Sequence, residues 1–289
     1  MSSKYDLIFI SSCINSKEIF NLIFSLDTDR TFLKKFLIIT NMSGVNISVH
    51  NKINYDLFII NEDKILNSSQ SRNLCINFLI KNKVSSKYYA FPDDDSTYDS
   101  SFFNFLYNQI YVSNKKLSNL VFDVKCRENL NLFYRSKIDK KVRKITKYDF
   151  DSIGAVNFIV NSFTFFNVGL FNEKFGVGSF YGAGEDGDYF LRALKLNEFY
   201  YFPNLYTIHP SSNKILNNNN LKFLKIRMFN YSRGVIKVLC SHKLIFYAVY
   251  ISLRPIAPFI YNLVLLNFNL SLLFFKVFLF RFYLIFKYL

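Results

Sequence analysis

The chain has 289 residues, 51% of them hydrophobic, which is enough for one large domain with an appendage or for two small domains. Its 36 lysines and arginines against 21 acidic residues give a formal net charge of +15, which predicts an anionic partner such as a nucleic acid, a lipid surface or a phosphorylated substrate. Four scattered cysteines without a Cys-x-x-Cys pair argue against structural zinc and a disulfide framework, and the apolar run near the N-terminus is too short for a signal peptide, so we expect a cytoplasmic body.

Short apolar runs alternate with a helical pattern over the first 60 or so residues. Residues 7–10, 36–39 and 57–60 are typical of buried strands, and residues 17–26 have the spacing of a helix. A Ser-Ser-Cys-Ile-Asn loop, beginning at Ser11, is expected after the first strand. This order of strand, loop, helix and strand predicts a doubly wound α/β sheet, in which ligands bind beyond the carboxyl ends of the strands.

A serine-rich stretch, SSQSRN at residues 68–73, precedes the next helical pattern. Its serines are suited to capping a helix that runs to about Asn82. The apolar residues 88–91 then predict another strand of the sheet.

Three aspartates, Asp93 to Asp95, follow that strand directly. Neighbouring carboxylates repel one another and raise one another's pKa, so such a cluster usually has a cation to hold it. In an extended segment Asp93 and Asp95 point to the same side, where two carboxylates suit Mg²⁺ or Mn²⁺ carrying a nucleotide diphosphate. The alternative is an acidic turn in which Asp95 or Ser96 caps a helix that begins near Ser100. The residues alone leave both interpretations open.

A glycine-rich segment, GVGSFYGAGEDGD at residues 176–188, contains more than half of the nine glycines of the chain. Such enrichment indicates tight turns or a backbone that approaches a ligand closely. A helical pattern begins at Asp188, so Asp186 or Asp188 is suited to cap that helix. On the residues alone, capping is the favoured interpretation.

Residues 69–95 and 171–192 together resemble the family 2 glycosyltransferases of the bacterial surface-polysaccharide type, an inverting group with the GT-A fold. Members of that family show a Ser-Arg-Asn element leading a helix, a strand ending in Asp-x-Asp, and a glycine-rich segment with Glu-Asp before a helix that carries Arg. All three elements occur here in that order. The resemblance spans roughly residues 5–210. It implies a Rossmann-like mixed α/β sheet flanked by helices in residues 1–210.

The same resemblance implies a donor site. Asp93 and Asp95 match the Asp-x-Asp element that holds the divalent ion and contacts the ribose of the sugar nucleotide. Arg72 matches an arginine that approaches the diphosphate or the sugar, and Asn41 stands where relatives often have an acidic residue that contacts the base. The donor-binding residues we predict are Ser11, Asn41, Arg72, Asp93, Asp94 and Asp95.

The resemblance also implies metal ligands and a base. His209 is similar to a late histidine near the metal or diphosphate, so Asp93, Asp95 and His209 are the predicted ligands of Mn²⁺ or Mg²⁺; His50 and His242 have no supporting pattern. Asp186 matches the general base, with its neighbour Glu185 as the second candidate. With the resemblance, we expect Asp188 to cap the helix and Asp186 to act in catalysis.

The chemistry of sugar transfer requires the same residue types. The departing diphosphate must be neutralised, which a divalent cation does as a Lewis acid, and the attacking hydroxyl must lose a proton to a carboxylate. A single displacement of this kind inverts the anomeric carbon. We therefore predict an inverting, metal-dependent glycosyltransferase that moves a sugar from a nucleotide-sugar donor, UDP by family habit, to a lipid-linked glycan in bacterial O-antigen or capsule-type synthesis.

Two other functions compete with this prediction. A metal-dependent nucleotidyltransferase fits the aspartates but leaves the Glu-Asp segment without a role. A basic nucleic-acid-binding protein would use the abundant aromatic residues for stacking. However, the cations lie among long apolar stretches, and no helix-turn-helix, RRM or zinc pattern occurs, so we expect no nucleic-acid partner.

Residues 211–289 form a basic and apolar tail, because no Asp or Glu occurs after Glu198. From Leu221 onward, apolar residues recur at spacings of three and four residues, with lysines between them. This pattern predicts a basic amphipathic helix on an anionic membrane surface. The uncharged residues 256–275 are long enough to span a bilayer, but Pro258 and three asparagines interrupt them, so re-entrant or interfacial helices are expected. This places the protein on the cytoplasmic face of the bacterial inner membrane, peripheral or monotopic; the alternative is a helical subdomain packed on the body.

Lysines and arginines are also frequent between residues 125 and 147. This run predicts a solvated loop, or a contact with an anionic acceptor such as a lipid-linked diphosphate.

Overall fold

The computed structural model describes residues 3–27, 33–49, 52–112, 118–133, 141–210 and 221–289. The chain forms two compact units, one of residues 1–171 with 189–211 and one of residues 172–188 with 212–289. The glycine-rich segment, expected in the N-terminal domain, therefore belongs with the C-terminal helices.

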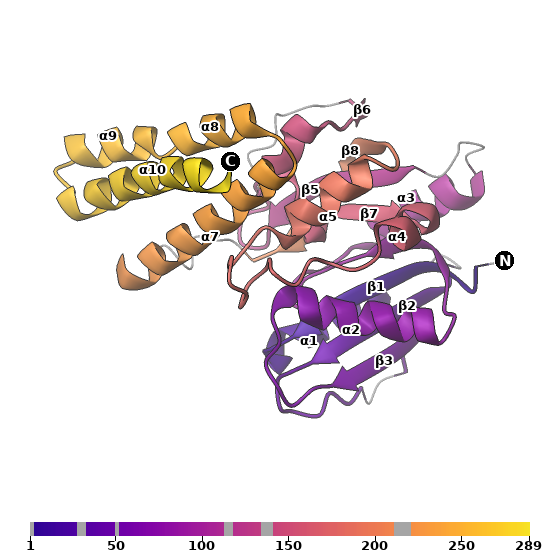
Figure 1. The fold of residues 1–289 in the computed structure, drawn as a ribbon. Helices are drawn as coiled ribbons and strands as arrows, with labels where there is room; N and C mark the ends of the chain where they lie inside the picture. The colour runs from indigo at the N-terminus through magenta and orange to yellow at the C-terminus, as the bar shows by residue number, and fades with distance from the viewer. Residues whose placement is uncertain (1–2, 28–32, 50–51, 113–117, 134–140, 211–220) are drawn as a thin grey trace. The chain divides into compact units, whose positions relative to one another are not determined.

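A mixed sheet of eight strands forms the centre of the first unit, in the order β3-β2-β1-β4-β7-β5-β8-β6 (Figure 1). The first four strands are parallel to one another: β1 (Tyr5–Cys13), β2 (Lys35–Asn41), β3 (Asp56–Asn61) and β4 (Ser86–Ala90). The remaining strands are β5 (Asn119–Cys126), β6 (Arg143–Lys144), β7 (Phe158–Asn161) and β8 (Phe199–His209). Of these, β7 is antiparallel to β4 and β5, β8 is parallel to β5, and β6 is antiparallel to β8.

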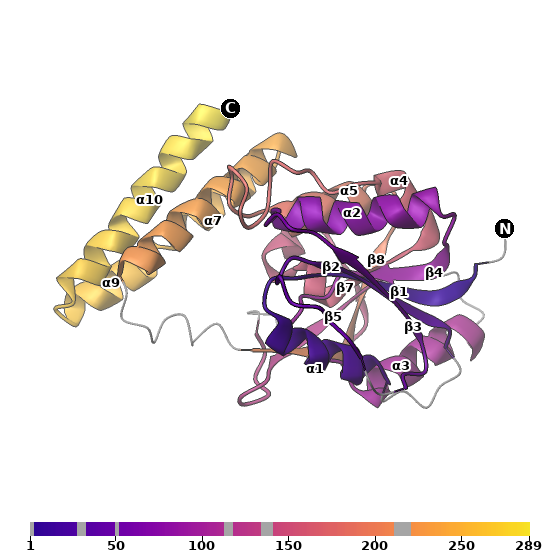
Figure 2. The same ribbon diagram turned by 90° about the horizontal axis from the view of Figure 1, so that it is seen from below.

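Helices cover both faces of this sheet, as Figure 2 shows with α2 on one face and α1 and α3 on the other. The α-helices are α1 (Ser16–Asp27), α2 (Ser68–Lys81), α3 (Ser100–Tyr107), α4 (Ser162–Val168) and α5 (Glu185–Leu194). Short helices of other types lie at Asn108–Val112, Lys147–Ser152 and Ala155–Asn157. The predicted mixed α/β sheet flanked by helices is confirmed.

Strand β1 is buried along almost its whole length because both of its faces are covered. Leu7 and Phe9 pack into a core cluster with residues of α1 and α3, whereas Ile8 and Ile10 point to the opposite face. The strand continues to Cys13, so the loop expected from Ser11 onward is wrong. Ladder hydrogen bonds depend on the backbone and not on side-chain polarity, so the strand continues through polar residues alongside β2 as far as Asn41.

Helix α2 has the limits that the sequence predicts, but not the predicted cap. Asn67 accepts a hydrogen bond from the Gln70 backbone N–H at 2.9 Å, and the Gln70 side chain accepts one from the Asn67 N–H at 3.2 Å. This reciprocal pair satisfies two N–H groups at the helix end, so Asn67 and not a serine is the N-cap of α2.

The second unit is helical. Its helices are α7 (Leu221–Ser241), α8 (Ile245–Leu253), α9 (Ile256–Val264) and α10 (Phe268–Tyr288), and α10 packs on the other three. Among the described helices, α10 alone is long and apolar enough to cross a membrane, judged by length and composition only. The uncharged residues 256–275 do not form one helix, because α9 ends and α10 begins within them.

Glycines explain why residues 172–188 belong to this unit. A Cβ on Gly234 of α7 would lie 2.1 Å from the Ala183 carbonyl oxygen, and one on Gly182 would lie 2.6 Å from the Asn230 Cβ. Only glycine lets the two backbones approach this closely. Gly182 and Gly184 of the glycine-rich segment therefore serve packing against α7.

Candidate functional site

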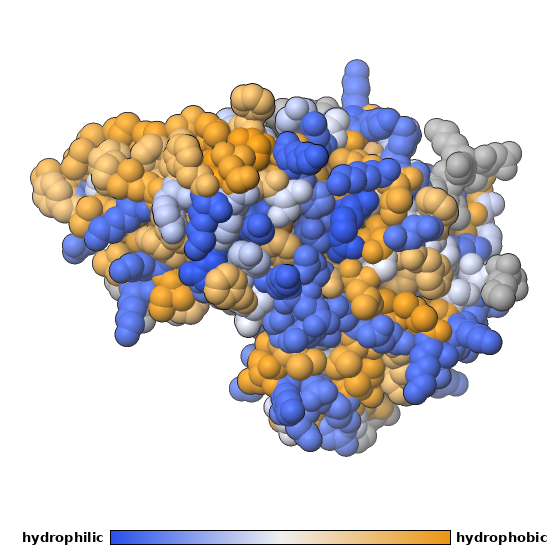
Figure 3. All heavy atoms as spheres, viewed as in Figure 1, coloured by the Kyte–Doolittle hydropathy of each residue, from blue (hydrophilic) through white to orange (hydrophobic). Residues whose placement is uncertain are grey.

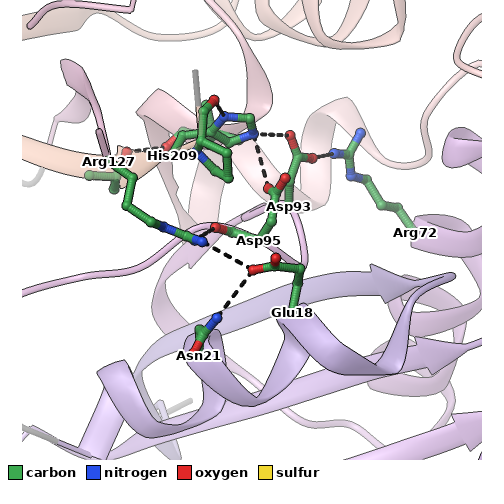
Figure 4. A network of polar contacts seen from close by, with 10 residues as sticks. Glu18, Asn21, Arg72, Asp93, Asp95, Arg127 and His209 are labelled. Carbon is green, nitrogen blue, oxygen red and sulfur yellow. Dashed lines mark hydrogen bonds and ion pairs between the residues drawn. The ribbon is translucent and has the colours of Figure 1, made fainter. Parts of the chain in front are cut away.

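The candidate site lies where β4 and β8 end, and all of its residues belong to the first unit. The chain leaves β4 at Ala90 and reaches the three aspartates after the buried Phe91 and Pro92. Thr97 then pairs with Ile208 of β8 through N–H to carbonyl hydrogen bonds of 2.8 and 2.9 Å. This pairing brings His209 beside the aspartates (Figure 4).

Asp93 lies between two cationic side chains. Arg72 Nη2 is 3.0 Å from Asp93 Oδ1, and His209 Nε2 is 3.6 Å from Asp93 Oδ2. The same His209 nitrogen is 3.0 Å from Asp95 Oδ1. The Asp93 side chain is 44% exposed although Arg72 is buried, so one side of the carboxylate faces solvent.

Ligand atoms of Asp93, Asp95 and His209 all lie within 4.8 Å of one another. Burial by itself lowers the pKa of His209, but its contacts with Asp93 and Asp95 outweigh burial and raise that pKa to about 10. Burial likewise acts to raise the pKa of Asp93, and His209 and Arg72 together bring it below its ordinary value. In the absence of a metal, a proton on His209 therefore balances the two carboxylates.

The donor set of this cluster suits a divalent cation. His209 Nδ1 lies 2.8 Å from the Pro210 carbonyl oxygen, which can only accept, so Nδ1 carries a proton. In the neutral ring Nε2 then presents a lone pair toward the aspartates. Two carboxylate oxygens and one imidazole nitrogen are ligands that Mn²⁺ accepts, and a bound cation would take the place of the proton.

Asp94 points away from this cluster. Its Oδ2 accepts a hydrogen bond from the Ile14 backbone N–H, just beyond β1, at 3.4 Å. Burial, with smaller contributions from the charges of Asp95 and Asp93, raises the pKa of Asp94 to about 6. Its place in the donor-binding set stays a prediction.

Arg127 supports the cluster from the other side (Figure 4). Its guanidinium donates to the Asp95 carbonyl oxygen and forms an ion pair of 3.0 Å with Glu18 on α1. Glu18 also accepts a hydrogen bond of 3.1 Å from Asn21, one turn along the same helix.

The prediction that residues 125–147 form a solvated loop is therefore wrong for Arg127. This arginine follows β5, whose register sets Cys126 opposite His209, and its own N–H donates to the His209 carbonyl at 2.9 Å. No local pattern reveals a pairing between strands that are so far apart in sequence. Arg143 and Lys144 form β6 and pair with Asp149 and Glu198, while residues 134–140 lie outside the described part of the chain.

Neighbouring residues of α2 fix Arg72 in place. Asn73 donates from Nδ2 to the Phe171 carbonyl at 3.0 Å and accepts from the Phe171 N–H at 2.8 Å. The Phe171 ring thereby lies 5.4 Å from the Arg72 guanidinium, a cation–π contact. In the Ser-Arg-Asn element, the arginine thus contacts Asp93 and the asparagine holds the Phe171 backbone, whose ring lies against the arginine.

Two predicted donor-binding residues are engaged or enclosed elsewhere. Asn41 donates to the Val45 carbonyl and to Asn61, both at 2.9 Å, and its Oδ1 accepts from Ser43. Ser11 is fully buried within β1, and its hydroxyl has no hydrogen-bond partner among the described residues. The donor-binding roles of both residues stay predictions.

The two base candidates are the first residues of helix α5 and belong to the second unit, which includes residues 172–188. Glu185 is buried, Asp186 is half-buried, and both lie in the first helical turn with Asp188. The expectation that Asp188 caps the helix is wrong, because α5 begins three residues earlier and Asp188 Oδ1 instead lies 2.9 Å from His242 Nε2. His242 follows α7, so sequence spacing gave no sign of this pair; His50 lies outside the described residues. The base role of Asp186 or Glu185 stays a prediction.

The alternative that Asp95 or Ser96 caps the next helix is also wrong. Asp99 is the N-cap of α3, and its Oδ1 accepts from the Ser101 and Phe102 N–H groups at 2.9 and 3.1 Å. Helix capping therefore does not account for the acidic cluster.

Solved structures of S. aureus TarS are similar to this chain. One aligns with a TM-score of 0.55 and 14% sequence identity, over 82% of this chain and 42% of TarS. TarS 1–349 in complex with UDP-GlcNAc aligns with a TM-score of 0.56 and 12% identity, over 82% of this chain and 71% of that one. The chain has the fold of TarS. A third structure, TarS 1–349 with UDP, aligns with a TM-score of 0.55 over 70% of its length.

The likeness to TarS confirms the predicted fold class. At these identities it concerns the fold alone, and this chain spans less than half of the TarS chain in the first alignment. A comparison with protein-family models finds no match, and a comparison with curated sequences finds no significant match. Membership of family 2 therefore stays a prediction.

Proposed function

We propose that this protein is a metal-dependent glycosyltransferase that uses a nucleotide sugar, with UDP as the nucleotide. The observation that carries the proposal is the cluster of Asp93, Asp95 and His209 with Arg72 at the ends of β4 and β8. The fold likeness to TarS, which was solved in complex with UDP-GlcNAc and UDP, supports the choice of donor.

In the proposed donor complex, Asp93, Asp95 and His209 hold Mn²⁺ or Mg²⁺. The bound cation neutralises the negative charge that develops on the departing diphosphate. Arg72 already forms an ion pair with Asp93, and its guanidinium provides a second positive charge for a phosphate oxygen. Arg127 holds the Asp95 backbone, which keeps that carboxylate beside His209.

For the acceptor half of the reaction we propose inversion at the anomeric carbon. Asp186, with Glu185 as the second candidate, takes the proton of the attacking hydroxyl. The acidic first turn of α5 favours a carboxylate there because of the helix dipole. The support for this step is the resemblance to family 2 glycosyltransferases.

We further propose a lipid-linked glycan acceptor, as in bacterial O-antigen or capsule synthesis, used at the cytoplasmic face of the inner membrane. The second unit supports this assignment, since it combines the apolar helix α10 with a segment that contains cations and no acidic residue. Such helices bind anionic lipid surfaces.

Donor binding in the presence and absence of metal tests the proposal. Calorimetric titration with UDP-GlcNAc and UDP should show binding that requires Mn²⁺ in the wild-type protein. Asp95→Ala should weaken metal-dependent binding by at least about 100-fold, because it removes a metal ligand. Glu198→Ala is the matched control. Glu198 is an exposed acidic residue just before β8, at the opposite end of that strand from His209.

Product analysis with radiolabelled donor decides the reaction class. Release of UDP together with free or transferred sugar supports glycosyl transfer. Release of the sugar 1-phosphate, with UMP transferred, would indicate nucleotidyl transfer instead. Equal donor binding with and without Mn²⁺, or unchanged binding in Asp95→Ala, would contradict the metal site.

A further inference from the structure

The helices α9 and α10 form an antiparallel hairpin whose tip is both apolar and exposed. Phe259 of α9 contacts Phe275 of α10, with ring centroids 5.3 Å apart, and Ser271 donates to the Phe259 carbonyl at 3.1 Å. At the tip the side chains of Val264, Leu265, Leu266 and Phe268 are between 58 and 75% exposed. Figure 3 shows apolar atoms over most of the visible face of α8, α9 and α10. A surface of this size in water calls for an apolar partner.

Each arm of the hairpin has a cationic residue at about the same distance from the tip. From Pro255 to Phe275 there is no charged side chain, and the segment is bounded by Arg254 and Lys276, both exposed. Arg254 precedes Leu265 by 11 residues and Lys276 follows Leu266 by 10 residues. At about 1.5 Å per helical residue, both cations lie roughly 15 Å from the tip. That distance is about half of the ~30 Å hydrocarbon thickness of a bilayer.

Helix α7 adds cations at the same level. It runs alongside α10 in the same direction, since the ring centroids of Phe229 and Phe280 are 4.7 Å apart and Lys237 lies 4.8 Å from the Tyr288 ring. With this register Lys225 is level with Lys276. Lys222 lies one turn nearer the tip, where its long side chain can reach toward a phosphate headgroup.

The turn between the two helices satisfies its own backbone donors. The N–H groups of Leu265, Leu266 and Asn267 donate to carbonyls of α9 at 3.1, 3.1 and 2.8 Å. The Asn262 side chain donates to the Pro258 carbonyl at 2.7 Å. Internal pairing of this kind is what the interior of a bilayer requires.

The second half of α10 is unsuited to the same environment. Arg281 donates to Ser232 of α7 and to the Ile251 carbonyl of α8, both at 2.9 Å. These bonds fix α10 to its neighbours. A crossing by α10 would also place Lys276 and Arg281 within the hydrocarbon, where cations are strongly disfavoured.

We propose that the α9–α10 hairpin inserts into a single leaflet of an anionic membrane, with its tip near the bilayer midplane and Arg254, Lys276 and Lys225 at the phosphate headgroups. The inference rests on the proposed membrane association, makes it monotopic, and does not depend on glycosyl transfer. The apolar tip contacts the acyl region of phospholipid, since the three cations named above match anionic headgroups.

Vesicle binding tests the tip. The full-length protein should co-sediment with vesicles of phosphatidylcholine and phosphatidylglycerol in equal parts. Val264→Glu combined with Leu265→Glu should reduce the partition coefficient on the order of 100-fold, because carboxylates would enter the hydrocarbon. Phe246→Glu is the matched control: Phe246 is 94% exposed but lies on α8, outside the hairpin, and should change binding less than about threefold.

Insertion depth separates the alternatives. The chain contains no tryptophan, so each single tryptophan reports one position. Phe268→Trp should be quenched by lipids brominated near the ends of the acyl chains, whereas Tyr283→Trp should not. Deeper quenching of Tyr283→Trp than of Phe268→Trp would show that α10 crosses the bilayer, because a crossing places Tyr283 nearer the midplane than Phe268 at the end of the helix. Shallow quenching at both positions would show a hairpin lying in the interface; either result overturns the proposal. Failure of the wild-type protein to co-sediment would overturn membrane association itself, while donor binding to the soluble protein would still test the glycosyltransferase assignment.

Discussion

At the residue scale, Asp6 forms a buried ion pair with Lys87 that differs in its role from the ion pairs of the candidate site. Asp6 at the start of β1 is almost fully buried and accepts from Lys87 at 2.8 Å, from Tyr111 at 2.7 Å and from the Lys34 N–H at 3.0 Å. None of these three donors belongs to the aspartate cluster at the end of β4. Its charge is therefore a matter of stability and not of ligand binding.

We predict that Asp6 makes stability depend on pH in the acid range. Burial acts to raise the pKa of Asp6, but Lys87, Tyr111 and the Lys34 N–H together lower it below its ordinary value. A carboxyl whose pKa is lowered on folding stabilises the protein above its unfolded pKa of about 3.9, and this contribution is lost as the pH falls through the folded pKa. Asp6→Asn should lower the free energy of unfolding at neutral pH by about 2 kcal/mol.

Urea denaturation at a series of pH values checks this prediction. The difference between wild type and Asp6→Asn should narrow once the pH falls below about 4, since the wild-type carboxyl then takes up a proton on unfolding and begins to lose its advantage. Asp63→Asn, at an exposed position, serves as the control and should have little effect at any pH. If the difference in the free energy of unfolding stays constant down to acid pH, Asp6 stabilises the protein through its packing and not through its charge.

The candidate site shows what residue patterns can and cannot predict. Asp93, Asp95 and His209 were found by residue type and by the resemblance, and the structure brings them together. Arg127 was assigned to a solvated loop because its role depends on the register between β5 and β8. The link between His209 and the aspartates likewise depends on the pairing of Thr97 with Ile208, which no window of local sequence contains.

At the element scale, periodicity located the N-terminal strands and helices because each has an apolar pattern of its own. The errors concern their ends. The sequence predicts serines as the cap of α2 and offers Asp95 or Ser96 as the cap of α3, whereas the caps are Asn67 and Asp99, and α5 begins before Asp188. Several Ser, Asn and Asp residues near each boundary are chemically able to cap, and the backbone geometry that chooses among them is not visible in the sequence.

Helix α7 offers an element-scale prediction in which two effects have opposite signs. By helix propensity alone, Gly234→Ala should stabilise α7 by about 1 kcal/mol. By packing it should destabilise, because the new Cβ would lie 2.1 Å from a backbone oxygen of Ala183, which cannot move without displacing the chain. Overpacking costs typically about 1–3 kcal/mol, and a backbone clash lies at the upper end of that range.

We therefore expect Gly234→Ala to lower the free energy of unfolding of the helical unit by about 2 kcal/mol. Thermal melting followed by circular dichroism of the full-length protein measures this change. Lys225→Ala, an exposed substitution in the same helix, controls for effects of alanine on α7 itself. A raised melting temperature in Gly234→Ala would show that α7 and the glycine-rich segment do not pack as described.

At the scale of the whole molecule, the sequence predicted the parallel half of the sheet better than the rest. Helix α1 separates β1 from β2 and helix α2 separates β3 from β4, whereas β7 inserts between β4 and β5 and has only four residues. A strand this short, flanked by helical turns, carries too little pattern to be recognised. The tail was predicted as a separate domain from residue 211, but composition gives no sign that residues 172–188 join it, since that contact depends on glycines facing α7.

The contacts between residues 172–188 and α7 lead to a prediction about a shortened chain. Residues 172–188 are held on α7 by close glycine contacts and by Arg233, which donates to the Phe180 carbonyl at 2.9 Å. Ending the chain at residue 210 would remove these partners and leave the core of the sheet, including Leu7 and Phe9, with its own contacts. Hydrogen exchange within residues 172–188 should then become faster by at least about tenfold, because local protection follows local packing.

Mass spectrometry of both proteins checks this, with peptides from β1 and β2 as the internal control that should exchange equally in each. Unchanged protection of residues 172–188 in the shortened chain would mean that this segment is ordered by contacts other than those with α7, and the base candidates Glu185 and Asp186 would then be positioned independently of the helical unit.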